Sequence, residues 1–307
     1  MNFDYLEISR SLCKDKPCID YLDWQYGNKL GWNMFHHEGC KSLEVWLNPE
    51  ATYMKIKGSI PYFIAGQNFS TGLEDFKSGI DYLASILELN LYYSEVKAFE
   101  FGTTINLPFM PKYLFDSHLK IKGMKSRLFD NGKYFEDQLV RVKMYDAGIN
   151  LKKKLDRHER EKLKVNCGYD PLCNYLKIEN HYKKPCVSFK LRTIQVIDLI
   201  EEPFQSMCKN DLLEKYTSII KTSEMQIQDK KQLSSSTIPL MILKEYEALL
   251  PKNAEELIKQ KIKSFPSDIM SKEDKKSRVR QLKSNFQKIE SLNKCQYDIS
   301  EMIKEKF

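Results

Sequence analysis

The feature that most constrains the fold is a change in hydrophobic period near residue 190. Before it, short segments such as 43–47 and 53–57 alternate apolar and polar residues, which is typical of half-buried strands. After it, apolar residues recur at helical spacing. We therefore predict an α+β domain over 1–205, with an antiparallel sheet and flanking helices. An all-helical C-terminal region is predicted over 206–307.

Local patterns predict individual elements within the first domain. The first forty residues are aromatic and irregular. Asn131-Gly132 supplies the positive φ angles of a tight turn and predicts a hairpin. The other expected elements are a helix at 72–90, strands at about 95–105, 139–146 and 175–182, and a charged helix at about 150–164.

Composition bounds the kind of protein that this chain forms. Of its 307 residues, 42% are hydrophobic and 30% are charged, a mixture that can bury a core. The net charge of +7 favours a polyanionic partner such as nucleic acid, although a Lys-rich soluble protein has a similar surplus. No apolar run approaches the roughly 18 residues of a membrane span, so no membrane association is expected.

The cysteines indicate neither a disulfide framework nor a closely spaced zinc site. None of the eight lies in a CxxC pair, and the N-terminal residues show no signal-peptide pattern. We therefore expect reduced thiols in a cytoplasmic protein. A zinc site at Cys167, Cys173, His181 and Cys186 is an alternative, but its irregular spacing favours ordinary thiols.

Three of the predicted strands place polar side chains on one face. Side chains alternate across a strand, so residues two apart share a face. The alternate positions, such as Val142 and Ile178, are apolar and fit a core. If the strands lie together in one sheet, its polar face carries Glu100, Arg141, Lys143, Tyr145, Lys177, Glu179 and His181.

These residue types suit the cleavage of a phosphodiester. Carboxylates and histidine bind divalent cations that polarise a phosphate, and a tyrosine oxygen can attack phosphorus to form a covalent intermediate. An ordinary phenol, with a pKa of about 10, needs the metal or nearby cations for this task. Cross-sheet ion pairs would explain the same residues without catalysis. We predict Tyr145, Lys143 and Arg141 as catalytic residues, and Glu100, Glu179 and His181 as ligands of Mg²⁺ or Mn²⁺.

Basic residues follow the strand that carries the tyrosine. A helix rich in lysine and arginine there suits the phosphates that flank a cut, whereas a solvated helix with internal ion pairs is the alternative. The Lys-rich helices at 236–290 are predicted to read duplex DNA, with a helical bundle for folding or oligomerisation as the alternative. The residues predicted to contact DNA are Lys152, Lys153, Lys154, Arg157 and Lys177.

Four short motifs occur in a fixed order. Tyr53–Asn68 reads as a strand, a small residue and Gly-x-Asn, and Val96–Phe101 as a strand with an acidic residue. Val140–Gly148 holds Tyr-Asp-x-Gly before a charged helix, and Leu176–Tyr182 has the form Leu-x-x-Glu-x-x. In this order they resemble the DNA-nicking replication initiators (Rep) of filamentous phages and rolling-circle plasmids, over residues 40–220.

The resemblance implies a rolling-circle replication initiator, which is a site-specific endonuclease and strand transferase. Tyr145 would become linked to a 5′-phosphate and leave a 3′-hydroxyl primer. Glu100 would bind the metal, and Glu179 would have a metal or structural role. The implied partners are single-stranded and duplex DNA at a replication origin, with a host helicase and a second copy of the chain as further candidates.

The chain departs from the family's pattern at several positions. Such initiators often have Asp at the position of Glu100 and Lys at that of Ala147, and their histidine–hydrophobic–histidine metal motif is absent here. His36 and His37 are adjacent and would point to opposite faces of a strand. Two alternatives therefore stay open: an origin-binding regulator without catalysis, and a metal-dependent nuclease that uses water.

Overall fold

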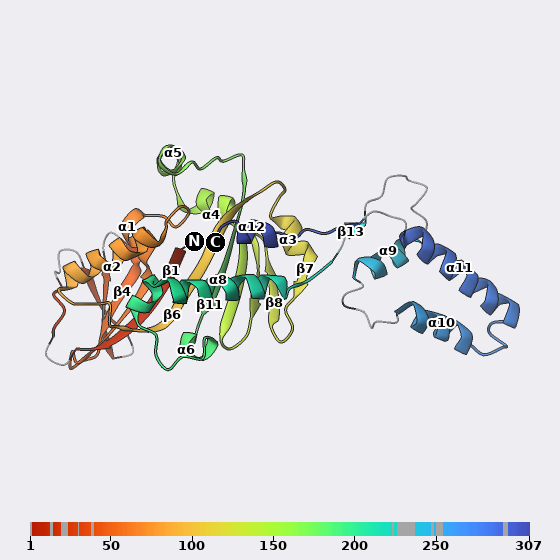
Figure 1. Ribbon diagram of the computed structural model, residues 1–307, viewed down its shortest axis with the longest axis horizontal. Coiled ribbons are helices and arrows are strands. Elements are labelled where there is room, and N and C mark those ends of the chain that lie inside the picture. Colours follow the sequence, from red (N-terminus) through yellow and green to blue (C-terminus); the bar gives the residue numbers. More distant parts are fainter. Residues whose placement is uncertain are drawn as a thin grey trace. The chain divides into compact units, whose positions relative to one another are not determined.

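The computed structural model describes residues 2–12, 15–19, 24–29, 31–37, 40–222, 224–225, 237–246, 249, 254–290 and 294–307 (Figure 1). The chain forms two compact units, each with its own buried cluster. The first comprises Met1–Phe115, Ile121–Ser218 and Ile299–Phe307, and the second comprises Asp116–Lys120 and Ile219–Asp298.

The division between the units differs from the boundary expected at residue 205. The first unit continues to Ser218, because Cys208 of the helix that follows residue 201 belongs to its core. The first unit also includes residues 299–307, where Ile303 is fully buried. The backbone N–H of Ile299 donates to the Tyr216 hydroxyl at 2.9 Å, which ties this segment to the first unit.

A ten-stranded antiparallel sheet forms the centre of the first unit. This confirms the predicted α+β class with an antiparallel sheet. In spatial order its strands are β2 (Trp24–Lys29), β3 (Trp32–His37), β4 (Cys40–Leu47), β5 (Tyr53–Ser59), β1 (Asn2–Ser11), β6 (Glu95–Leu107), β11 (Asn174–Tyr182), β10 (Val140–Asp146), β9 (Gly132–Glu136) and β8 (Lys125–Phe129).

Two helices of the first unit, α2 and α8, pack on one face of this sheet. Phe76 of α2 contacts Phe3 of β1, with ring centroids 5.2 Å apart, and Phe204 of α8 contacts Phe99 of β6 at 5.8 Å. The polar strand positions lie on the other face, where Leu151 of α4 packs with Tyr175 of β11. The helices are α1 (Ile60–Ala65), α2 (Leu73–Leu87), α4 (Ala147–Lys154), α5 (Arg157–Cys167), α6 (Pro185–Ser188), α7 (Val196–Ile200), α8 (Glu202–Thr217) and α12 (Ser300–Lys304), together with α3 (Lys112–Ser117), at whose end the chain enters the second unit.

The second unit is mainly helical, as predicted, and also contains two short ladders. Leu240, Met241, Phe286 and Ile289 form its buried cluster. Its elements are α9 (Ile238–Glu245), α10 (Ala254–Ser264) and α11 (Lys272–Glu290), with β7 (His118–Lys120) paired to β12 (Ile220–Lys221) and β13 (Glu224–Met225) paired to β14 (Lys294–Cys295).

Two predictions about the elements were wrong. The first forty residues are not irregular, since they contain β1, β2 and β3. The charged helix expected over 150–164 is two helices, because Asp156 begins α5 as an N-cap that accepts from the backbone N–H of Glu159 at 2.8 Å. The first of them, α4, starts earlier, directly after β10, where Asp146 caps it through the N–H of Ile149.

Candidate active site

Three carboxylates from three neighbouring strands meet on the polar face of the sheet. They belong to Asp4 of β1, Glu100 of β6 and Glu179 of β11, and all three residues are buried. One oxygen of each lies within 4.8 Å of the others, a spacing at which they can bind one cation. We call this group the carboxylate cluster.

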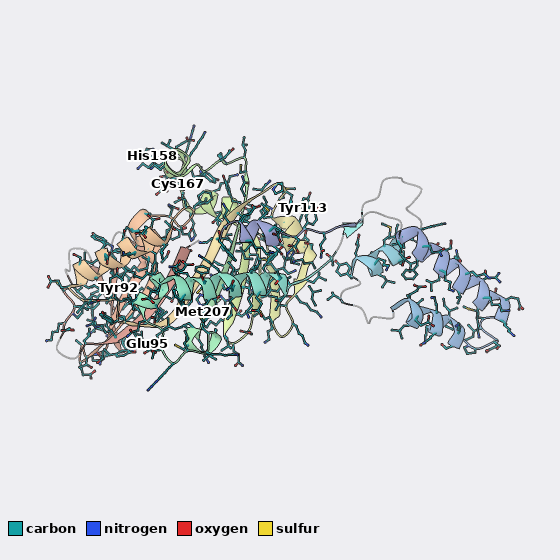
Figure 2. The ribbon with its side chains drawn as sticks, viewed as in Figure 1. Tyr92, Glu95, Tyr113, His158, Cys167 and Met207 are labelled. Atoms are coloured by element: carbon teal, nitrogen blue, oxygen red, sulfur yellow. The ribbon has the colours of Figure 1, made fainter. Side chains whose placement is uncertain are left out.

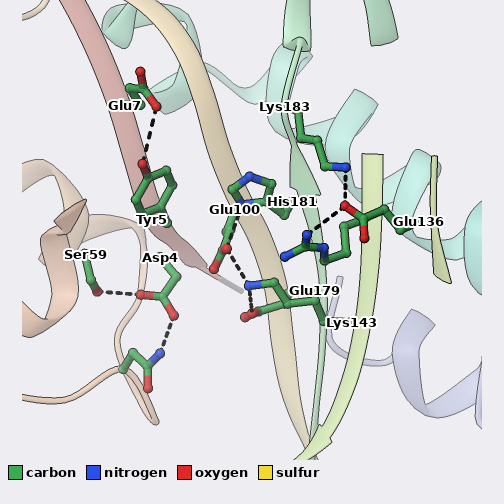
Figure 3. A network of polar contacts seen from close by, with 12 residues as sticks. Asp4, Tyr5, Glu7, Ser59, Glu100, Glu136, Lys143, Glu179, His181 and Lys183 are labelled. Carbon is green, nitrogen blue, oxygen red and sulfur yellow. Dashed lines mark hydrogen bonds and ion pairs between the residues drawn. The ribbon is translucent and has the colours of Figure 1, made fainter. Parts of the chain in front are cut away.

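A β-bulge brings Asp4 into the cluster. Phe3 lies opposite Phe101 and Leu6 lies opposite Phe99, so two residues of β1 face one residue, Glu100. The bulge keeps Phe3 and Leu6 in the core while Asp4 points towards the carboxylates (Figure 3). The sequence pattern does not predict Asp4, because it indicates an irregular structure for this region. The signal that could have found it is the three-residue step between Phe3 and Leu6.

A glycine next to Glu179 makes room for the cluster. Gly102 of β6 lies directly opposite Glu179 in the ladder. A Cβ atom at Gly102 would lie 2.4 Å from the Cβ of Glu179 and 2.3 Å from the carbonyl oxygen of Ile178. Only glycine therefore allows this approach of β6 and β11, and it leaves space beside the Glu179 side chain.

Two lysines neutralise part of the cluster's charge. The Nζ of Lys177 lies 2.7 Å from Asp4 Oδ2 and 3.3 Å from Glu179 Oε2. Lys143 donates to Glu100 and, at 3.0 Å, to Glu179 Oε1 (Figure 3). Three carboxylates against two ammonium groups leave one negative charge. The donor set of hard carboxylate oxygens therefore fits a divalent cation such as Mg²⁺ or Mn²⁺.

These contacts shift several pKa values. Burial alone would raise the pKa of Glu100, but hydrogen bonds and charges of His181 and Lys143 outweigh it and hold that pKa below its usual value. Burial opposes the charge of Lys143 as well, yet Glu179 and Glu100 raise its pKa above the usual range. Both groups are therefore charged at neutral pH, and the pair stays intact.

Tyr145 lies beside the cluster at the end of β10. Its hydroxyl donates to Glu179 Oε2 at 3.4 Å. Burial, then the charges of Glu179, Asp4 and Glu100, raise the pKa of the Tyr145 phenol well above its usual value. The phenol is therefore protonated in the metal-free protein, and only a cation near these carboxylates would favour its ionised form.

A cavity of about 510 Å³ opens above the cluster and the phenol. Ser59 and Asn68 line it and donate to the two oxygens of Asp4, which fixes that carboxylate (Figure 3). Ser59 also begins α1 as its N-cap. Lys154 lines the cavity from α4, with its Nζ 4.8 Å from the ring centroid of Tyr62. The cavity thus combines carboxylates, a phenol and a cation.

The structure brings together most of the residues that were predicted as a site. Glu100, Glu179, Lys143 and Tyr145 meet as expected, but their assigned roles stay predictions. His181 lies beside Glu100, with Nδ1 2.7 Å from Oε1, and Asp4 completes the carboxylate cluster instead.

The remaining predicted residues lie in different surroundings. Arg141 bonds to Glu136 at 2.7 Å, outside the cluster. Lys177, predicted as a DNA contact, is only 2% exposed and forms ion pairs with Asp4 and Glu179 of the carboxylate cluster. The other predicted DNA contacts remain on the surface of two helices: Lys152, Lys153 and Lys154 on α4, and Arg157 on α5.

The alternative zinc site is not assembled. Cys167 lies on α5 (Figure 2), whereas α6, which carries Cys186, lies at the other end of the sheet (Figure 1). Among the described residues, the metal-ligating side chains that cluster are the three carboxylates. No helix in the described part of the chain has the length and apolar character needed to cross a membrane.

Comparisons with known proteins identify no relative. No protein-family model matches the chain, and neither a curated protein nor a solved structure matches it. The resemblance to replication initiators therefore stays a prediction, and any function has to be argued from the geometry of the carboxylate cluster and its cavity.

Proposed function

We propose that the protein is a metal-dependent DNA strand transferase that nicks one strand at a replication origin, with Tyr145 as the nucleophile. One observation carries the proposal: the Tyr145 hydroxyl lies 3.4 Å from a carboxylate oxygen of a three-carboxylate cluster, on the floor of an open cavity. A nucleophile, a base and ligands for a hard cation are what tyrosine-dependent phosphodiester cleavage requires.

Asp4, Glu100 and Glu179 would hold the Mg²⁺ or Mn²⁺ ion. When bound, such an ion would polarise the scissile phosphate and favour the ionised phenol. Lys143 would move from between Glu100 and Glu179 as the ion takes over its charge, since both compete for the same oxygens. Lys177 would stay in place, because its ion pairs with Asp4 and Glu179 hold these two carboxylates in position.

The chain's own residues can carry the proton and bond changes of the nick. The phenol proton passes to Glu179 Oε2, with which the hydroxyl is already hydrogen-bonded. The Tyr145 oxygen then bonds to phosphorus while the bond from phosphorus to the 3′ oxygen breaks. The departing 3′ oxygen takes a proton from water. The products are a 5′-phosphotyrosine and a 3′-hydroxyl, and the reverse sequence reseals the strand.

Covalent trapping with a matched tyrosine control tests this function. The protein is incubated with Mn²⁺ or Mg²⁺ and labelled single-stranded DNA from its own replicon's origin, then run on a denaturing gel. We expect a protease-sensitive shifted band that Tyr145→Phe abolishes. Tyr134→Phe should keep the band, because Tyr134 lines the same cavity without bonding to a carboxylate. An adduct that persists in Tyr145→Phe contradicts the proposal.

A water-using nuclease is the second candidate, and the raised pKa of Tyr145 favours it. A buried phenol among carboxylates is a poor nucleophile until a cation is bound, whereas the same carboxylates can serve a metal-activated water. This candidate predicts cut DNA with free 5′-phosphates and no attached protein. An origin-binding regulator predicts DNA binding with neither cutting nor adduct.

A further inference from the structure

Paired lysines and tryptophans continue the polar face of the sheet away from the carboxylate cluster. The Nζ of Lys55 lies 4.7 Å from the ring centroid of Trp32, and that of Lys57 lies 4.5 Å from the ring of Trp46. All four side chains are half-buried. In the register, Lys57 is paired with Glu7 of β1, two residues along the strand from Tyr5, which lines the carboxylate cavity.

A second cavity lies on the same face, with a volume of about 490 Å³. Four lysines line it, and two glutamates oppose them, so it carries excess positive charge. Glu7 of β1 lines this cavity and accepts from the hydroxyl of Tyr5, which lines the first, so the two cavities adjoin along β1. The lysines are Lys55, Lys97, Lys183 and Lys184, and the glutamates are Glu7 and Glu95 (Figure 2 labels Glu95).

We propose that these paired side chains of β3, β4 and β5, together with the second cavity, form a track for a single DNA strand that leads to the carboxylate cluster. The inference rests on the proposed function for the identity of the strand, which is the one to be cut. Along a strand the step from Glu7 to Asp4 spans about 10 Å. The second cavity would therefore hold backbone phosphates close to the nick.

Charge and ring chemistry select the occupant. Phosphates favour the lysines, and half-buried indole rings offer faces on which unpaired bases stack. Bases within a duplex keep their faces stacked on one another, so a duplex would leave the two tryptophans unused. An acidic peptide would form ion pairs with the lysines but would place no bases on the indole rings. A single nucleic-acid strand uses both, and the proposed reaction makes that strand DNA.

Tryptophan fluorescence can follow occupation of the track directly. The chain has three tryptophans, Trp24, Trp32 and Trp46, all within β2–β4. We would use the Tyr145→Phe protein without metal, so that the DNA is not cut. It is titrated with an oligothymidylate of about 15 nucleotides, which is long enough to fill a single-strand groove. Saturable quenching is expected, and poly-glutamate should not reproduce it. Equal quenching by poly-glutamate would overturn the proposal.

Variants separate the rings from the charges. Trp32→Leu and Trp46→Leu should each weaken oligothymidylate binding on the order of tenfold, measured by anisotropy of a labelled strand. The control is Tyr26→Ser, an exposed aromatic whose ring contacts Phe35 of the opposite face. Unchanged affinity in both tryptophan variants contradicts the track, provided that their circular dichroism matches that of the parent.

Lysine variants keep the rings and test the charges. Lys55→Gln should reduce the slope of log affinity against log salt concentration by about one unit, because one phosphate contact is lost. Lys77→Gln on α2 should leave that slope unchanged. An unaltered salt slope in Lys55→Gln overturns the phosphate contact. If the wild type forms the covalent adduct but the tryptophan and lysine variants bind DNA unchanged, the track is wrong and the proposed function stands. Quenching that these variants weaken, without any adduct, would keep the track and remove the proposed function.

Discussion

The ammonium group of Lys143 would compete with a metal ion for the same carboxylate oxygens. Lys143 lies between Glu100 and Glu179, and its side chain is 15% exposed. Removing one partner from a buried ion pair leaves charge uncompensated, which costs far more than losing a pair at the surface. The same removal frees carboxylate oxygens for a cation. The residue should therefore stabilise the metal-free protein and oppose metal binding.

We predict that Lys143→Met lowers the free energy of unfolding by about 3 kcal/mol without metal. Mn²⁺ should then raise the melting temperature of this variant more than that of the wild type, because the ion replaces the lost ammonium. Differential scanning fluorimetry with and without Mn²⁺ measures both effects. Lys183→Met, which removes a partner of the more exposed Glu136, should cost less than about 1 kcal/mol and leave the Mn²⁺ effect unchanged.

The pH dependence of that variant follows from Glu100. Its pKa is lower in the folded protein, so its stabilisation is present above the unfolded-state pKa and is lost as pH falls through the folded value. Without Lys143 the folded pKa rises towards the unfolded one, and less stabilisation remains to be lost. The destabilisation by Lys143→Met should therefore shrink in urea unfolding as the pH is lowered below about 4. A constant difference would contradict this role.

At the scale of elements, the sequence predicted side-chain faces correctly only where apolar and polar residues alternate regularly along a strand. In β10 and β11 buried apolar residues such as Val142 and Ile178 alternate with polar ones, so parity placed Tyr145 and Glu179 on one face correctly. Parity could not find Asp4, because the bulge in β1 shifts the phase by one residue. It also could not show that Lys177 lies under the cluster, since burial depends on neighbouring strands that are distant in sequence.

The approach of β6 to β11 gives a prediction at the same scale. A Gly→Ala change that fits its backbone usually stabilises by restricting the unfolded chain. Gly102→Ala should instead destabilise by about 1–3 kcal/mol, because its Cβ would meet Glu179 Cβ at 2.4 Å. Gly72→Ala is the control, since its Cβ would meet only Asp75, at 3.8 Å. Chemical unfolding followed by fluorescence measures both, and a stabilised Gly102→Ala would contradict the close approach.

At the scale of the whole molecule, the chain passes between the two units four times. It leaves the first unit after Phe115, returns at Ile121, leaves again after Ser218 and returns at Ile299. The sequence pattern gave the helical character of the second unit, but not this interleaving. Hydrophobic period reports which elements form. It does not report with which distant elements a short segment such as α12 will pack.

The stability of the first unit should therefore depend on residues beyond the second. Ile303 of α12 is fully buried, so Ile303→Ala should lower the free energy of unfolding by about 2–5 kcal/mol. Tryptophan fluorescence isolates this effect, since all three tryptophans lie in the first unit. The exposed Glu305→Ala serves as the control. An unchanged tryptophan transition in Ile303→Ala would show that α12 contributes nothing to the first unit.

The interleaving also sets the order of events while the protein is being made. Domains usually fold one after another as they leave the ribosome. Here the strands of the large sheet emerge early, but the site left by α12 on the first unit stays open until residues 299–307 have followed. The second unit is complete in sequence before the first can close. The nascent chain must keep that apolar site from other partners while the residues between Ser218 and Ile299 are being made.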